Sequence, residues 1–338
     1  MPLDLVLAGS ILLSLVFYVL LGGADYGGGV WDLLAFGKGA AAQRRAIANA
    51  IGPIWEANHV WLVLIVVLLF TAFPVAFGRI SIVFHVPLTL ALIGIVLRGC
   101  AFTFRNYLGP GDHAERWWGR VFASASLATP VLLGTVLGGI YVGRARRGAD
   151  FLSGWLAPFP LAVGLFTLCL VAYLAATYLT VETSHDPDLR EAFRAKALVA
   201  GVFTILVGAV LLWTDDRDVS AHPAATALIA ARAATAVVAA GALWSLAAHR
   251  FRTARILVAL QAAMIVVTWG AHQYPYLIPP DVTIRAAAAP TSTLRMLTWA
   301  LAVGAALLFP GFYYLFRVFK GGLLSTPQME RTARRESE

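Results

Sequence analysis

Residues 49–61, NAIGPIWEANHVW, place ionisable side chains between two long apolar runs. Glu56 lies three residues before His59, so a helix would present both on one face. A charged side chain inside a membrane costs about 2.5–3.5 kcal/mol unless it is paired, protonated or in contact with water. Pro53 leaves the carbonyl of Asn49 without its usual helical donor. These groups suit a proton path; the alternative is a carboxylate that only complements the dipole at a helix start.

Two further charges lie in apolar surroundings. Asp25 lies in GGADYGGGVWD, where Gly23 and Gly27 are spaced to permit close packing of helices. This segment is not a phosphate-binding loop, because the GK[ST] ending is missing. Arg98, in IVLRGCAFTFR, is always charged. We expect Arg98 either to pair with Asp25 or Glu56 or to extend to the membrane surface, and Asp25 alternatively to cap a helix end.

Metal-binding motifs are not found in the sequence. It contains no CxxC, HxxxH or HExxH, and Cys100 and Cys169 are far apart. The one ExxH, Glu56 to His59, lacks the second copy that a di-iron bundle needs. The spacing therefore predicts no metal site in this chain, and the alternative is a haem held by a single histidine.

The elements that must position these residues are membrane helices. The 338 residues are 59% hydrophobic and only 13% charged, whereas a soluble protein carries about 25% charged residues. Long unbroken apolar runs indicate helices rather than the short alternating strands of a barrel. The net charge of +8 is explained by basic cytoplasmic loops rather than by nucleic-acid binding. The sequence therefore predicts an all-α integral membrane protein.

The apolar runs predict about nine transmembrane helices. They cover residues 3–22, 51–77, 80–102, 121–142, 155–179, 197–213, 224–248, 255–271 and 294–319. We expect a single polytopic transmembrane domain over 1–320 and a polar cytoplasmic tail over 321–338. Arg232, in the seventh run, has no evident partner. Four prolines exclude a continuous helix over 272–299, which forms either a folded lip or a simple loop.

Loop charges predict the orientation of the chain. Lys and Arg are more numerous in the segments that lie inside if the N-terminus is outside. The positive-inside rule therefore predicts an outside N-terminus and a cytoplasmic C-terminus, against which only the RARR cluster at 144–147 argues. This orientation places Asp25, Glu56 and Arg98, from three consecutive spans, at one depth near the cytoplasm.

Several motifs, in their order and spacing, resemble subunit II of the cytochrome bd-type quinol oxidases (the CydB family). The motifs are GGADYGGGVWDLL, RRAIANAIGPIWEANHVWL, FPVAF, LRGCAFTFR, WWGRVF, YLIPPDVTI and TLRMLTW. The resemblance covers essentially the whole chain, and the block from Trp55 to Trp61 is highly specific.

The resemblance implies two four-helix bundles plus a peripheral helix in the bacterial cytoplasmic (inner) membrane. It implies a heterodimer with a larger haem-bearing subunit I (the CydA family), which carries two b-type haems, a d-type haem and the quinol site. The complex would oxidise quinol, reduce dioxygen to water and take protons from the cytoplasm. This chain would ligate no cofactor, although some members hold a structural quinone. A small accessory subunit and membrane lipids are the other partners considered.

The resemblance also suggests residue roles. It assigns the proton path and subunit interface to Asp25, Glu56, Arg98, Asn58 and His59, and packing around the partner's haem to Trp55 and Trp61. Many members have aspartate at the position of Glu56, and some have glutamine at that of His59. Two alternatives stay open: a proton-coupled transporter with Glu56 as its carrier group, and a purely structural subunit whose charges only stabilise the dimer.

Overall fold

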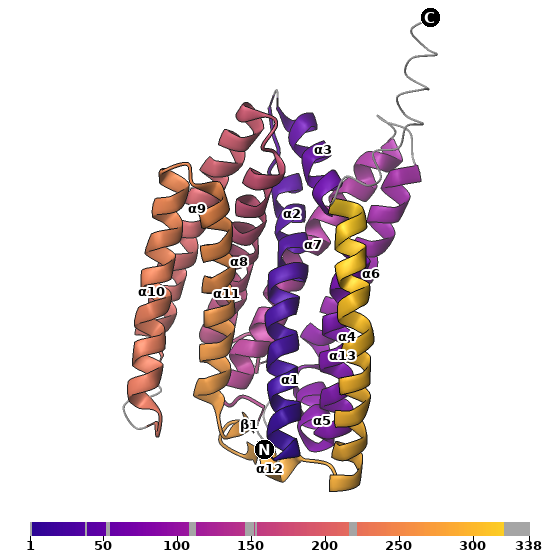
Figure 1. Cartoon of the computed structure of the whole chain (residues 1–338), viewed down its shortest axis with the longest axis vertical. Helices are drawn as coiled ribbons and strands as arrows, with labels where there is room; N and C mark the ends of the chain where they lie inside the picture. Colours follow the sequence, from indigo (N-terminus) through magenta and orange to yellow (C-terminus); the bar gives the residue numbers. More distant parts are fainter. Residues whose placement is uncertain are drawn as a thin grey trace, which may run out of the picture.

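The computed structural model describes residues 2–37, 39–51, 55–107, 113–145, 152, 154–215 and 222–320, without the side chains of 51, 55–57, 105–107, 115–116 and 315–320. Most of the described chain is helical, and Figure 1 shows the long helices running side by side along one axis. The chain begins at one end of this bundle and the last helix finishes at the other. The expected tail, 321–338, lies outside the described residues.

Fourteen of the described elements are helices or helical turns and two are short strands. In chain order they are α1 (Leu3–Phe17), the π-helical turn η1 (Tyr18–Gly22), α2 (Gly23–Leu33), α3 (Ala40–Ile51), α4 (Trp55–Ala72), α5 (Pro74–Val83), α6 (His85–Tyr107), α7 (His113–Tyr141), α8 (Pro158–Glu182), α9 (Pro187–Trp213), α10 (Ala225–Ala247), α11 (Phe251–Gln273), β1 (Tyr276–Ile278), β2 (Val282–Thr283), α12 (Ile284–Ala287) and α13 (Thr291–Lys320).

The prediction of about nine spans is confirmed. Among the described residues, eight helical segments are long and apolar enough to cross a membrane, and the bent pair of α4 and α5 would make a ninth. The bend of 117° falls between Ala72 and Pro74. A proline has no amide hydrogen for the helical ladder but is accepted in a first turn, so the chain stops one helix and starts another there. The predicted second span, 51–77, was therefore too long as a straight helix.

The first span is longer than predicted. It continues from Leu3 to Leu33, because α1 passes through the π-helical turn into α2 without a break. Asp25 thus lies inside a helix and not at a helix end. The sixth and eighth spans are also longer, Pro187–Trp213 and Phe251–Gln273, because their polar first turns are helical although they lie outside the apolar runs.

The helices form two groups and an outlier. One group contains α1 with α2, α4, α6 and α7, and the other contains α8, α9, α10 and α11, with α2 and α7 packed against α8 at the seam. The outlier α13 lies along α1 and α4, and 0% of its most apolar window is buried within the chain. Two bundles plus a peripheral helix agree with the expected architecture.

Small residues let α2 approach its neighbours closely. A Cβ atom on Gly27 would lie 1.9 Å from the carbonyl oxygen of Val171 in α8, and one on Gly29 would lie 2.2 Å from Oγ of Ser126 in α7. Gly23 faces the side chain of Val171 as well. Trp31 Nε1 then donates a hydrogen bond of 2.7 Å to a carbonyl of α8. The expected close packing at Gly23 and Gly27 is confirmed, and α2 is held between both bundles.

The proline-rich segment after α11 is a folded lip. Its strands β1 and β2 pair antiparallel, and Thr283 caps the short helix α12 by accepting from the amide of Ala286. The amide of Ala289 donates to the carbonyl of Ala72, at 2.8 Å. Arg79 of α5 lies 3.5 Å from the carboxylate of Asp281. These contacts attach the lip to the bend between α4 and α5.

Candidate functional site

A buried carboxylate and amide join the first two spans. Asp25 of α2 is 4% exposed and Asn58 of α4 is 2% exposed. The side-chain amide of Asn58 donates a hydrogen bond to Oδ2 of Asp25. The same nitrogen lies 3.5 Å from the carbonyl oxygen of Leu21. Asn58 therefore connects α4 both to the acid and to the backbone of the π-helical turn.

The π-helical turn has no clear signal in the sequence, yet such turns are frequent at functional sites. It begins at Tyr18, whose hydroxyl lies 3.0 Å from that of Tyr26. Both rings are buried, at 6% and 2% exposure. The sequence-based interpretation missed these two tyrosines. Their separation by eight residues in one apolar span, which returns to the same helix face, was the available signal.

Arg98 of α6 reaches the same cluster from the other side. It is 2% exposed, so it does not extend to the membrane surface as the alternative had it. Its Nε donates to the hydroxyl of Ser126 at 3.1 Å. Its guanidinium carbon lies 4.9 Å from the centre of the Tyr26 ring and 5.1 Å from that of Phe122. Arg98 thereby links α6 to α2 and α7.

The predicted ion pair between Arg98 and Asp25 is not among the contacts of the described residues. Arg98 packs instead on the next residue of α2, Tyr26, because successive residues of a helix project about 100° apart. The other expected partner, Glu56, has a described backbone at the start of α4, but its side chain and that of Trp55 lie outside the described residues.

His59 and Trp61 continue along α4. The His59 ring centre lies 6.3 Å from that of Tyr18 and 6.4 Å from that of Tyr26. Trp61 is 4% exposed and stacks on Phe17 of α1 at 4.4 Å, with Phe312 of α13 at 5.8 Å. The described contacts of Trp61 are thus within this chain, and its role beside a partner's haem stays a prediction.

The cluster brings together Asp25, Asn58, His59 and Arg98 through the two tyrosines. They come from α2, α4 and α6, the three spans that the topology argument placed at one depth. The groups available are a carboxylate, an amide, an imidazole, two phenol hydroxyls and a guanidinium. Such a set, buried among membrane helices, can accept, hold and pass protons but has no evident nucleophilic chemistry.

Replacing Arg98 by lysine is expected to lower the stability of the folded chain by about 1–2 kcal/mol, because lysine keeps the charge but loses the planar group that both packs on Tyr26 and donates to Ser126. Thermal denaturation in detergent measures this. The matched control is Arg120→Lys, an exposed position in α7. Equal denaturation temperatures for the two variants would contradict the structural role of the Arg98 plane.

A second buried acid explains Arg232. Its Nη2 lies 3.3 Å from Oδ2 of Asp215, whose side chain is 6% exposed. The same oxygen accepts a hydrogen bond of 2.7 Å from the hydroxyl of Tyr141. The partner that sequence analysis did not find therefore follows the end of α9. This group lies at the opposite end of the bundle from Asp25.

No multi-residue metal site is seen among the residues that the structure describes. They contain no group of three or more His, Cys, Asp or Glu placed to hold a metal. His59 is half-buried, with its ring centre 6.3 and 6.4 Å from those of Tyr18 and Tyr26.

Comparison with known proteins gives a consistent result. Residues 3–319 match the family described as "Cytochrome bd terminal oxidase subunit II". A Bacillus subtilis (strain 168) protein, provisionally named cytochrome bd menaquinol oxidase subunit II, is 27% identical over 94% of this chain and 95% of its own length. Cytochrome bd-I ubiquinol oxidase subunit 2 of Escherichia coli (strain K12) is 25% identical over 77% of this chain and 80% of its own.

The fold is shared with a solved structure. A chain of the bd oxidase from Geobacillus thermodenitrificans superposes with a TM-score of 0.78, at 23% identity, over 94% of this chain and 99% of that one. The arrangement of long helices described above is therefore the arrangement of that protein.

Proposed function

The chain belongs to the cytochrome bd terminal oxidase subunit II family, and from this premise we propose that it is the haem-free subunit of its oxidase and conducts protons to the partner. As a member it is part of a quinol oxidase complex, an oxidoreductase of the bacterial inner membrane. In our proposal a larger subunit I holds the haems and the quinol site, and this chain ligates no cofactor. Quinol, membrane lipids and a small accessory subunit are the further partners.

The reaction sets the demand on this chain. Reducing dioxygen to water consumes protons, which in our proposal come from the cytoplasm. They must therefore cross part of the apolar layer, where only polar side chains or water can carry them. A subunit packed against the haem-bearing one can supply such side chains without taking part in electron transfer.

The observation that carries the proposal is the buried hydrogen bond from Asn58 to Asp25. A carboxylate without a hydrogen-bond partner inside a membrane span would cost free energy, so an acid at this position favours a functional role. Glu56 lies two residues before Asn58 in α4. The hydroxyls of Tyr18 and Tyr26 lie 3.0 Å from each other in the same cluster. All of them lie in the half of the bundle that we expect to face the cytoplasm.

The alternatives make different demands. A transporter using Glu56 would work without a haem-bearing partner, which the family membership argues against. A purely structural subunit would need the charges for assembly but not for turnover. Neutralising Glu56 while preserving its shape separates the structural reading from the conduit.

We expect Glu56→Gln to assemble normally and to slow turnover by about tenfold or more, because an amide cannot relay a proton as a carboxyl group does. The complex is purified from native membranes through a tag on this chain. A reduced-minus-oxidised visible spectrum reports assembly, and oxygen consumption with quinol reports turnover. Glu182→Gln, at the end of α8 and paired with Arg255 at 3.4 Å, is the control.

Two outcomes would overturn the proposal at different levels. Normal turnover by an assembled Glu56→Gln complex would exclude the conduit and leave the structural role. A tagged chain that purifies alone and colourless would remove the haem-bearing partner and favour the transporter.

A further inference from the structure

A basic cavity of about 390 Å³ lies where the end of α8 meets the starts of α9 and α11. This volume falls in the range typical of small-molecule sites. Its lining includes Arg190, His249, Arg250 and Arg252, with Ser184 and Thr253, and no acidic residue. The cavity is at the end of the second bundle that also carries the start of α9 in Figure 1, away from the cluster around Asp25. Its chemistry favours an anion.

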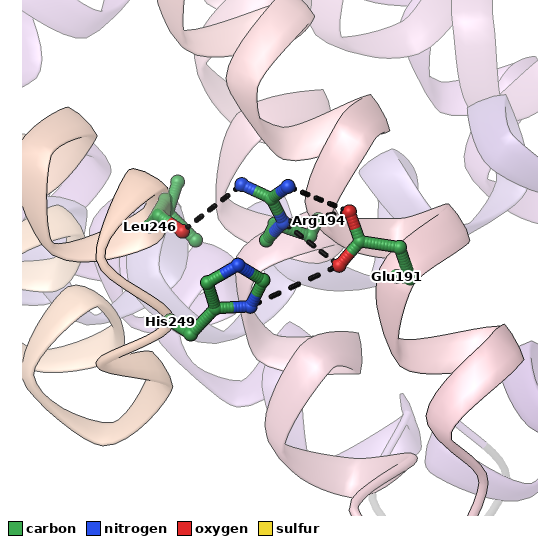
Figure 2. Close-up of polar contacts among 4 residues, drawn as sticks. All are labelled: Glu191, Arg194, Leu246 and His249. Carbon is green, nitrogen blue, oxygen red and sulfur yellow. Dashed lines mark hydrogen bonds and ion pairs between the residues drawn. The ribbon is translucent and has the colours of Figure 1, made fainter.

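The neighbouring acid is already occupied, as Figure 2 shows. Arg194 Nε donates to both carboxylate oxygens of Glu191, at 2.9 and 2.8 Å. His249 Nδ1 lies 3.9 Å from the same carboxylate, and Arg194 also reaches the carbonyl of Leu246, at 3.5 Å. These contacts fix the turn between α10 and α11 against α9. They leave the arginines of the cavity without this carboxylate as a partner.

The cavity has donors without acceptors. Arg190 packs over the ring of Phe251 at 5.0 Å, and its Nε is buried without a hydrogen-bond partner among the described residues. Arg252 forms no ion pair with any residue in the described ranges. The 23-residue helix α11 starts here, and its N-cap, Arg250, gives no side-chain hydrogen bond. Phe251, Arg252 and Thr253 of its first turn line the cavity, so the positive end of the helix dipole lies beside it.

An apolar stripe leads away from the cavity along α11. Ile256 and Leu260 follow Arg252 at successive four-residue steps, so they share its helix face. They are 67% and 45% exposed, and Val267 continues the stripe at 48%. Trp244 of α10 is 58% exposed with Arg250 over its ring at 5.0 Å, a pairing typical of the membrane–water boundary. A cationic pocket above an exposed apolar stripe matches an amphiphile better than a free ion.

We propose that this pocket binds the phosphate group of an anionic phospholipid, whose acyl chains lie along the stripe of Ile256, Leu260 and Val267. The phosphate oxygens accept hydrogen bonds from Arg190, Arg252 and the first-turn amides of α11. The arginine fork suits bidentate contacts to phosphate, and Ser184 and Thr253 add hydroxyl donors at the rim.

The test titrates the purified complex with dioctanoyl-phosphatidylglycerol and, separately, with inorganic phosphate, by calorimetry. We expect the lipid to bind the double variant Arg190→Gln/Arg252→Gln about thirtyfold more weakly than the native complex, since each arginine near an anionic group contributes about a factor of five. The single variant Arg252→Gln, at an exposed position, should lose about fivefold and guards against a misfolded double variant. Arg120→Gln, an exposed arginine of α7, should bind as the native complex does.

Each other result contradicts the proposal. Equal lipid affinity of the native complex and of both pocket variants would show that the pocket is not the site. Inorganic phosphate binding as tightly as the lipid, with the same loss in the variants, would assign the pocket to a free anion. An equally large loss of lipid affinity in Arg120→Gln would show that the effect comes from the net charge of the complex and not from the pocket.

Discussion

Replacing Asp25 by asparagine is expected to slow quinol-driven oxygen consumption of the assembled oxidase by about a hundredfold, the contribution of a positioned proton-transfer group. The carboxylate is 4% exposed and accepts a hydrogen bond from Asn58. An asparagine has the same shape and keeps an acceptor oxygen for that bond, but it cannot take up a proton. The fold should therefore survive while the relay is interrupted.

Oxygen consumption normalised to the haem spectrum measures this prediction. The control is Asp281→Asn in the lip, where the carboxylate side chain is 38% exposed and pairs with Arg79 at the other end of the bundle. It should retain native turnover. Native turnover by assembled Asp25→Asn would instead show that protons reach the partner without this acid.

Replacing Gly27 by alanine is expected to abolish most of the assembled complex. The added methyl carbon would lie 1.9 Å from a carbonyl oxygen of α8 and 2.7 Å from Cβ of Ala175. Neither is the end of a flexible side chain, so α2 and α8 must move apart. Overpacking of this kind costs about 1–3 kcal/mol or more, and the displaced helix is the one that carries Asp25.

The yield of haem-containing complex and its denaturation temperature measure this effect. Gly9→Ala is the matched control, since it makes the same change in the same span where a Cβ would meet nothing within 4 Å. Indistinguishable yield and denaturation temperature for the two variants would contradict the close contact between α2 and α8.

The topology was predictable because membrane solvation leaves a strong mark on sequence. Apolar runs indicated the spans. The orientation indicated by the basic residues, with Asp25, Glu56 and Arg98 at one depth near the cytoplasm, stays a prediction. Arg98 lies over the ring of Tyr26, the residue that follows Asp25 in α2. The bend at Pro74 was not predicted, although a proline, which lacks the amide hydrogen of the helical ladder, indicates such a break.

Side-chain partners were harder to predict because they depend on helix rotation. Arg98 was expected to pair with Asp25 or Glu56. Its described contacts are with Tyr26 and Ser126, and the side chain of Glu56 lies outside the described residues. The π-helical turn depends on one extra residue per turn, which apolar periodicity does not reveal over five residues. The ion pair between Arg232 and Asp215 depends on how α9 and α10 pack against each other. Asp215 lies outside any apolar run, so the search within spans missed it.

The clamping of α2 has a kinetic consequence. With glycines pressed against α7 and α8, and Trp31 bonded to α8, this helix cannot tilt or slide without separating two bundles. In the proposed conduit, protons would then pass Asp25 by rotation of side chains and exchange of water around a stationary backbone. The rate of this passage should follow the fast timescale of such local motions rather than the slower one of moving helices.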